Sequence, residues 1–230
     1  MREHAGRSEA VARAARERSE HERGALPSKV LVIGCGALVR ELRAAAALND
    51  GLRLEVECLP AILHNRPERI PGAVRRRVRA AKARGAYSTI IVGYMDCGTG
   101  GLLDRVCAEE GVERLPGAHC YELYAGAEAF AGLQDAEPGT FYLTDYLVRH
   151  FDRLIMDGLG VSRHPELREA YFGNYTRVVH LAQADDDRLA RAAERAAARL
   201  GLRCTRIVTG VGGLAGRIVE LAGADAPAAA

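Results

Sequence analysis

The feature that most constrains the fold of this chain is an alternation of short apolar runs with amphipathic stretches. Lys29–Gly34 (KVLVIG) and Tyr87–Gly93 (YSTIIVG) are largely apolar and end in glycine, which is typical of strands buried on both faces of a parallel sheet. Stretches with helical periodicity follow such runs. The alternation predicts an α/β fold, a doubly wound and mostly parallel sheet with helices on both faces.

Further elements extend the pattern along the chain. We expect strands at Leu52–Cys58, Arg177–Leu181 and Leu202–Thr209, and helices at Ala37–Leu48, Pro71–Arg84, Gly100–Glu110, Thr144–Gly158, Asp185–Leu200 and Gly213–Leu221. The middle, from Val112 to Phe172, is expected to be an insertion of loops and helices, with Thr144 as an N-cap. Because no Pro/Gly/Ser-rich linker interrupts the chain, we expect one domain over residues 27–222. Residues 1–26 form a charged leader, helical or disordered, and residues 223–230 a disordered tail.

Composition excludes several classes of function. The chain has 230 residues, 48% of them hydrophobic and 27% charged, and its net charge of +2 does not favour binding to nucleic acid or an anionic membrane. The arginine-rich segment 66–84 is expected to be a solvated helix face. No apolar run approaches the roughly 18 to 20 residues of a membrane span, and the start of the chain lacks a secretory apolar core. With six cysteines and no such signal, we expect a cytoplasmic protein with reduced thiols.

The cysteines fall into two groups by their position along the predicted strands. Ligands of open parallel sheets bind beyond the carboxyl ends of the strands, and Cys35 and Cys97 follow the first and third strands. His64 lies in the loop beyond the second strand, and Cys120 in the loop after Gly111–Pro116. The remaining thiols share apolar faces of their strands or helices and are expected in the core; they are Cys58, Cys107 and Cys204.

The four soft side chains Cys35, Cys97, Cys120 and His64 predict a metal site. Zinc takes cysteine and histidine in this number, and three cysteines equally suit an iron–sulfur cluster with one open iron. Cys35 and Cys97 precede helices, whose N-termini favour thiolate. Each residue taken alone is as readily a small side chain in a tight turn, and no C-x-x-C pair is present.

Other polar residues near these cysteines are candidates for binding or catalysis. The loop Asp96–Gly101 could hold an anionic group of a substrate through Asp96, Gly98, Thr99 and Gly100, or it could be a tight glycine turn. His119, Tyr121 and Glu122 adjoin Cys120 and could act as acid–base groups or orient the ligands. Asp145 is expected to be a first-turn helix charge rather than a site acid.

At these residues the chain resembles a bacterial and archaeal family called domain of unknown function 1638. The likeness consists of the first strand ending in Cys35, Leu63-His64-Asn65 followed by Pro67, the Cys97-Gly98 turn, the pair His119-Cys120, and the segment Gly139–Thr144. It covers roughly residues 29–215. Members commonly read His-Asp-Cys where this chain reads His119-Cys120-Tyr121. The resemblance implies an association with corrinoid-dependent methyl transfer, and therefore with one-carbon metabolism.

Three functions follow from these observations. The first is a metal-dependent enzyme, a transferase of small molecules, with zinc or an iron–sulfur cluster held by Cys35, Cys97, Cys120 and His64. The second is a non-catalytic accessory protein that carries a metal, a corrinoid or a small anion for a partner enzyme such as a methyltransferase. The third is a metal-free enzyme that uses Cys97 or Cys120 with a histidine base.

Overall fold

The computed structural model describes residues 29–47 and 53–222. The expected leader and tail, residues 1–26 and 223–230, lie outside the described residues, as do Leu48 and Leu52 at the ends of two predicted elements. Within the described part, no helix has the length and apolar character needed to cross a bilayer.

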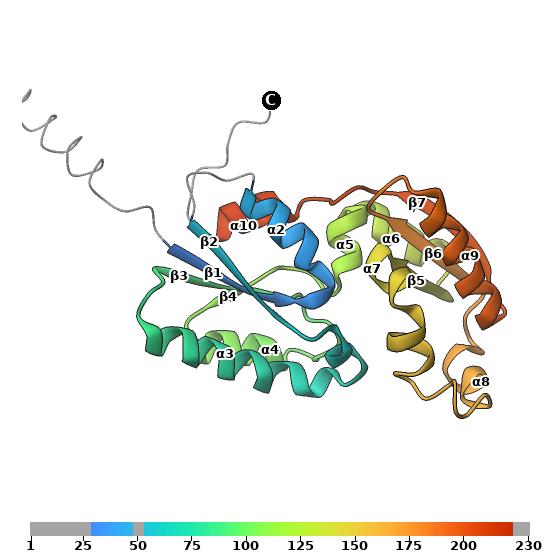
Figure 1. The fold of residues 1–230 in the computed structure, drawn as a ribbon, viewed down its shortest axis with the longest axis horizontal. Coiled ribbons are helices and arrows are strands. Elements are labelled where there is room, and N and C mark those ends of the chain that lie inside the picture. The colour runs from blue at the N-terminus through green and yellow to red at the C-terminus, as the bar shows by residue number, and fades with distance from the viewer. Residues whose placement is uncertain (1–28, 48–52, 223–230) are drawn as a thin grey trace, which may run out of the picture.

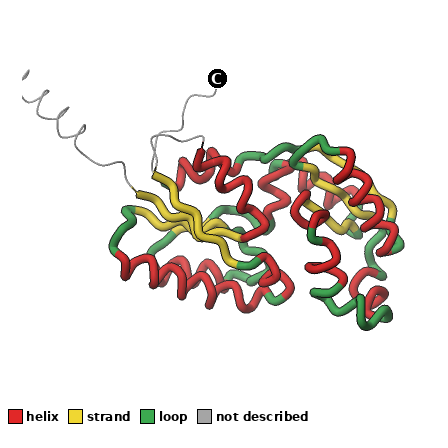
Figure 2. The backbone as a smooth tube through the Cα atoms, viewed as in Figure 1, coloured by secondary structure: helices red, strands yellow, loops and turns green. Residues whose placement is uncertain are grey.

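The strands form two parallel sheets, which confirms the predicted α/β class and divides the strands between two sheets instead of one (Figure 1). The first sheet has the order β2-β1-β3-β4 and the second the order β5-β6-β7, and all the pairings are parallel. The strands are β1 Lys29–Cys35, β2 Arg53–Leu59, β3 Thr89–Gly93, β4 Glu113–Arg114, β5 Thr140–Thr144, β6 Arg177–Ala182 and β7 Arg203–Val208. Figure 2 shows them as two separate groups of strands.

Helices cover both faces of each sheet. In the first sheet α3 and α4 lie on one face, and α2 and α10 on the other. In the second sheet α7 and α9 pack together on one face, and α5 and α6 lie on the other. The helices are α2 Val39–Ala47, α3 Ile70–Arg84, α4 Leu102–Glu110, α5 Cys120–Ala125, α6 Ala127–Ala136, α7 Asp145–Arg149, α8 Leu167–Phe172, α9 Asp187–Leu200 and α10 Leu214–Leu221.

The middle of the chain differs from the predicted insertion of loops and helices, because it contains β5, the first strand of the second sheet. β4 pairs with β3 over two residues, so the first sheet ends there, and α5 and α6 separate it from β5. Thr144 caps α7 as expected, accepting a hydrogen bond from the Leu147 N–H at 3.4 Å. The predicted helix to Gly158 is interrupted after Arg149, and a π-helical turn, Asp152–Met156, follows.

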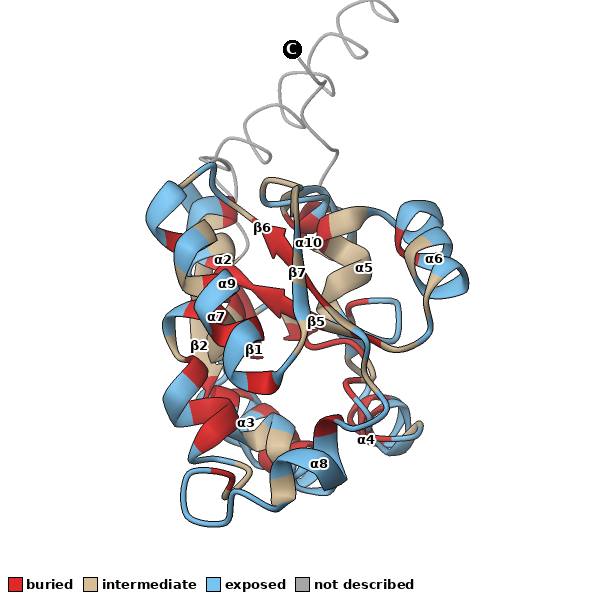
Figure 3. Cartoon of the chain, turned by 90° about the vertical axis from the view of Figure 1, so that its right-hand side faces the viewer, coloured by how far each residue is buried: buried red, intermediate tan, exposed pale blue. Residues whose placement is uncertain are grey.

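The core extends through both sheets. Residues 30–33 of β1 are fully buried, and they belong to the same cluster of apolar side chains as Val178 of β6 and Leu189 of α9. Figure 3 shows buried strands surrounded by helices with exposed outer faces. Cys58, Cys107 and Cys204 pack in or against this cluster, as predicted.

The arginine-rich outer face of α3 is largely neutralised by ion pairs within the chain. Arg79 contacts Glu110 at 2.7 Å, and Arg84 contacts Glu57 at 2.7 Å. Arg75 pairs with Glu109. These pairs agree with the predicted solvated helix face, since the arginine charges are balanced by acids of α4 and β2.

The two central strands of the first sheet approach closely at their carboxyl ends, where Gly34 of β1 lies beside Gly93 of β3. A Cβ atom on Gly93 would lie 2.9 Å from Val32 Cγ1 and 3.0 Å from Gly34 Cα. The second of these contacts is with backbone, which cannot rotate away. Glycine is therefore required where the strands deliver Cys35 and the loop of Cys97.

We predict that Gly93→Ala destabilises the fold by about 1–3 kcal/mol, the usual cost of overpacking a core, measured by urea unfolding. Gly132→Ala in α6 is the matched control, because a Cβ there has no neighbour within 4 Å. Alanine in a helix is better than glycine by roughly 0.5–1 kcal/mol, so the control should be at least as stable as the parent. Equal stability of the two variants would contradict the packing described.

Candidate functional site

A cavity of about 370 Å³ lies between the two sheets, at the carboxyl ends of β1, β3 and β5. We call it the thiol pocket, because Cys35, Cys97, Cys120 and His64 line it together. Aromatic and aliphatic side chains supply most of the remaining wall, among them Tyr94, Tyr121, Phe141, Leu154, Phe172 and Tyr175. The four soft side chains that the sequence singled out therefore share one cavity.

Cys35 and His64 form the closest pair among these four. Cys35 is the last residue of β1, and its Sγ accepts a hydrogen bond from the Ala37 N–H at 3.3 Å. His64 lies in a 3-10 turn, Ala61–Asn65, with Nδ1 3.8 Å from Cys35 Sγ and 3.1 Å from the Ala61 carbonyl oxygen. A carbonyl can only accept, so Nδ1 carries the proton in neutral His64 and Nε2 keeps its lone pair.

Cys97 has an unusual backbone. Its φ is 51°, the left-handed region that residues other than glycine seldom adopt. Two backbone hydrogen bonds hold the loop there, from the Asp96 N–H to the Gly117 carbonyl at 3.1 Å and from the Cys97 N–H to the Ala118 carbonyl at 2.8 Å. Such conformations persist where surrounding contacts fix them, often at functional sites.

Cys120 is the first residue of α5, directly after His119. It belongs to the second half of the structure, whereas Cys35 and Cys97 follow strands of the first sheet. The pocket thus joins thiols from both halves of the chain.

The thiols are buried among apolar groups, and this burial overrides the expected effect of the helix N-termini. Burial raises the pKa of Cys35 to about 12 and that of Cys97 to about 11. Burial, followed by the neighbouring thiols, also raises the pKa of Cys120 well above its ordinary value. The expectation of stabilised thiolates at Cys35 and Cys97 is therefore wrong for the metal-free chain, because desolvation of the charged form outweighs the hydrogen bonds that the sulfur atoms accept.

His64 lies at the rim of the pocket, exposed on one side and stacked on Tyr94 on the other, with ring centroids 5.9 Å apart. Despite the exposed side, crowding of the ring by its neighbours, together with the nearby His119, lowers the pKa of the imidazole. His64 is therefore neutral at pH 7.

The donor set of the pocket fits a soft metal ion in chemistry but not in position. Three thiols and an imidazole are the ligands that zinc and iron–sulfur clusters prefer. Within residues 29–47 and 53–222, however, no three His, Cys, Asp or Glu side chains lie close enough together to hold one ion. Cys35 Sγ and His64 Nδ1 are 3.8 Å apart, but Nδ1 donates its proton to the Ala61 carbonyl, so Nε2 is the nitrogen of His64 that a metal could take.

The loop Asp96–Gly101 after β3 forms a tight turn, the second of the two interpretations that its sequence allowed. The Asp96 carboxylate accepts hydrogen bonds from Thr99 Oγ1 at 2.7 Å, the Gly101 N–H at 2.9 Å and the Gly100 N–H at 3.2 Å. These bonds lower the pKa of Asp96. The hydrogen-bond donors of Thr99 and Gly100, which were predicted to hold an anion, are therefore occupied by the Asp96 carboxylate. Gly98 has a φ of 80°, the left-handed conformation that the turn requires.

Tyr121 is the one residue of the predicted acid–base group that lines the pocket. Its hydroxyl donates a hydrogen bond to the Tyr142 carbonyl at 3.4 Å. His119 is exposed and precedes α5 as its N-cap. Glu122 accepts a hydrogen bond from the Ala118 N–H at 3.0 Å, so its carboxylate caps the first turn of α5.

Tyr94 is a site residue that the sequence analysis missed. It follows β3 directly, is fully buried, and lines the pocket beside the Cys35 and Cys97 thiols. Among the described residues its hydroxyl makes no hydrogen bond of ordinary geometry, and its polar neighbour is the Cys35 thiol. Burial, together with these thiols, raises the pKa of Tyr94 far above its usual range. Its position directly after an apolar strand could have identified Tyr94 as a residue of the sheet edge.

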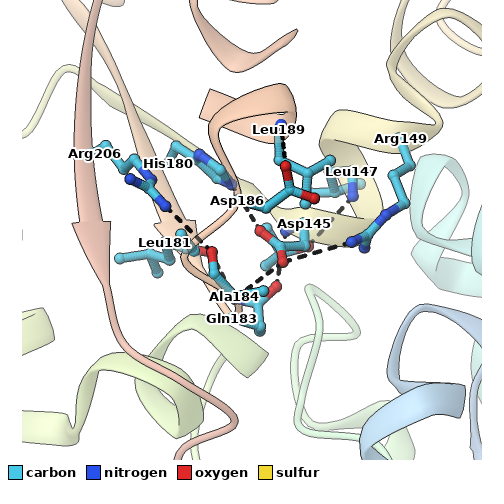
Figure 4. Close-up of polar contacts among 12 residues, drawn as sticks. Asp145, Leu147, Arg149, His180, Leu181, Gln183, Ala184, Asp186, Leu189 and Arg206 are labelled. Atoms are coloured by element: carbon cyan, nitrogen blue, oxygen red, sulfur yellow. Dashed lines mark hydrogen bonds and ion pairs between the residues drawn. The ribbon is translucent and has the colours of Figure 1, made fainter. Parts of the chain in front are cut away.

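Asp145 lies in the first turn of α7, as expected, and its carboxylate is buried. Its Oδ1 lies 2.9 Å from Nε2 of the fully buried His180, and its Oδ2 accepts a hydrogen bond from the Ala184 N–H at 3.1 Å (Figure 4). Asp145 thereby ties the start of α7 to the loop after β6. It lies next to Thr144, which lines the thiol pocket.

Comparison with known proteins gives a family and no activity. A family model described as protein of unknown function (DUF1638) matches residues 58–216. No curated protein and no solved structure matches the chain. The match agrees with the resemblance found in the sequence.

The raised pKa values predict slow alkylation of the pocket thiols in metal-free protein. At pH 8 the thiolate fraction of Cys97, with a pKa of about 11, should be about 100-fold smaller than that of an ordinary thiol. We expect its reaction with iodoacetamide, followed by peptide mass spectrometry, to be slower by about that factor in chelator-treated native protein than in urea. The rate should rise about tenfold per pH unit towards pH 11. Rapid labelling of native Cys97 at pH 7 would contradict this.

Proposed function

Because the chain belongs to the family described as protein of unknown function (DUF1638), whose name assigns no activity, we propose a function from the pocket itself. The chain is an enzyme that acts on a small molecule held between the two sheets, and the pocket thiols are its reacting or metal-binding groups. The observation that carries this proposal is the lining of one cavity by Cys35, Cys97, Cys120 and His64, which come from four separate segments.

The first form of the proposal is a metal-dependent transferase. Zinc or an iron–sulfur cluster would be held by the three thiols, with His64 as a fourth ligand, once the sulfur atoms move closer together than they lie here. A bound metal would supply deprotonated, activated thiolate or a Lewis acid. The chain's own part is to exclude water and to orient the substrate against the apolar wall, which includes Tyr94.

The second form is a metal-free thiol enzyme, and one observation favours it. The left-handed backbone of Cys97, with φ 51°, is held by two hydrogen bonds, as expected of a side chain presented at a fixed angle. In this form Nε2 of His64, which keeps its lone pair, is the available base.

A role in methyl transfer is compatible with either form, because a thiol is a chemically suitable methyl acceptor. A corrinoid macrocycle is much larger than a cavity of about 370 Å³. A corrinoid-bearing methyltransferase would therefore deliver its methyl group at the mouth of the pocket rather than lodge its cofactor inside. The alternative is a non-catalytic accessory protein that carries a ligand for a partner enzyme. It predicts that the ligand stabilises the folded chain and that the chain alone forms no product.

We predict that anaerobically purified protein carries about one zinc per chain, or a cluster with visible absorption, measured by elemental analysis and spectroscopy. Cys35→Ser, Cys97→Ser and Cys120→Ser should each lose most of the metal. Cys204→Ser is the matched control, because Cys204 packs against the core outside the pocket.

If the wild-type protein contains no metal, the metal-dependent form is rejected. The metal-free thiol form is then tested by measuring turnover in the cysteine variants. Loss of activity in Cys97→Ser, with activity kept in Cys204→Ser, is then expected. Full activity in all three pocket variants would reject the proposed function.

A further inference from the structure

We infer that the substrate of the thiol pocket is a neutral, largely apolar molecule with a flat, aromatic part. The inference rests on the proposed function in one respect, that the pocket takes the substrate. It adds the chemical class of the substrate, which follows from the aromatic side chains that line the cavity and from the absence of charged ones.

The lining carries no formal charge at neutral pH. Among the described residues that face the cavity, none is Asp, Glu, Lys or Arg, although charged residues make up 27% of the chain. Asp96, the nearest predicted anion-loop residue, directs its carboxylate to its own loop. A carboxylate, phosphate or ammonium group of a ligand would therefore be buried without a counter-charge, which is strongly unfavourable.

The walls are aromatic on both sides. His64 and Tyr94 are stacked on the side of the first sheet, 14° from parallel. On the side of the second sheet Phe141 lies 5.2 Å from Phe172 and 5.4 Å from Tyr175 between ring centroids, both edge to face. Flat apolar ligands gain most from such surfaces.

Few polar groups are free to bind a ligand. The Asn65 amide donates to the Leu154 carbonyl at 2.8 Å, and the Thr144 hydroxyl caps α7. The Tyr94 hydroxyl is shielded from the cavity, because it is fully buried beside the Cys35 thiol. Because Nδ1 of neutral His64 carries the proton, Nε2 is available as an acceptor. The lining thus offers a ligand few polar partners, and the pocket volume of about 370 Å³ lies at the small end of ligand pockets, roughly 300–1,000 Å³.

Met95 provides a local reporter for the test. It lines the pocket, whereas Met156 does not, so protein labelled with ¹³C-methyl methionine distinguishes binding in the pocket from binding elsewhere. The probes are benzamide, benzoate and benzyltrimethylammonium, which share a ring and differ in charge. We expect benzamide to shift the Met95 methyl signal and to bind at least about tenfold more tightly than either ion.

A charge placed at the pocket edge should reverse the preference for the neutral probe over the anion. Tyr171 lines the pocket yet is 47% exposed, so Tyr171→Arg should fold and should bind benzoate in preference to benzamide. Val208→Arg is the matched control, because Val208 is 54% exposed and lies outside the pocket lining. It should keep the parent's preference.

Each other result overturns the inference. Binding of benzoate or of the quaternary ammonium at Met95 as tightly as benzamide shows that the pocket accepts charge, and the proposed function would then stand with another substrate class. Absence of any Met95 shift with all three probes also rejects the inference, and the thiol variants decide the proposed function separately.

Discussion

The parallel direction of the strands is the constraint on which the site depends. Parallel pairing places the ends of all strands of a sheet at one edge, and the close contact of Gly34 with Gly93 brings the ends of β1 and β3 together. β5 of the second sheet ends at the same cavity, where Thr144 lines the wall. Residues far apart in the chain thus meet without any local motif.

Burial determines the protonation state of the thiols in this pocket. Apolar walls that would bind a neutral ligand also withdraw solvent from the thiols, so the thiols stay protonated unless a metal or a base takes the proton. The same burial raises the pKa of the Tyr94 hydroxyl, which lies beside the Cys35 thiol. Protonated thiols are weak nucleophiles, so the metal-free pocket holds its cysteines in their less reactive form.

Much of this arrangement could be predicted from the sequence, because strand ends are visible in it. Cys35 directly follows one apolar run and Cys97 comes four residues after the end of another, so the topology rule alone places both at the sheet edge. β5 was missed because its five residues lie among short helices and loops, and without it the division into two sheets could not be foreseen. The pairing of Asp145 with His180 depends on the register of β5 with β6, for which the sequence carries no local signal.

Three thiols from separate segments of the chain line one cavity between the sheets. A crystal structure of the chelator-treated chain, with sulfur positions located by anomalous scattering, tests this claim most directly. We predict that the Sγ atoms of Cys35, Cys97 and Cys120 all border a single cavity, with Tyr94 beside them. Any of the three sulfur atoms facing away from that cavity, into a separate part of the core, would contradict the account.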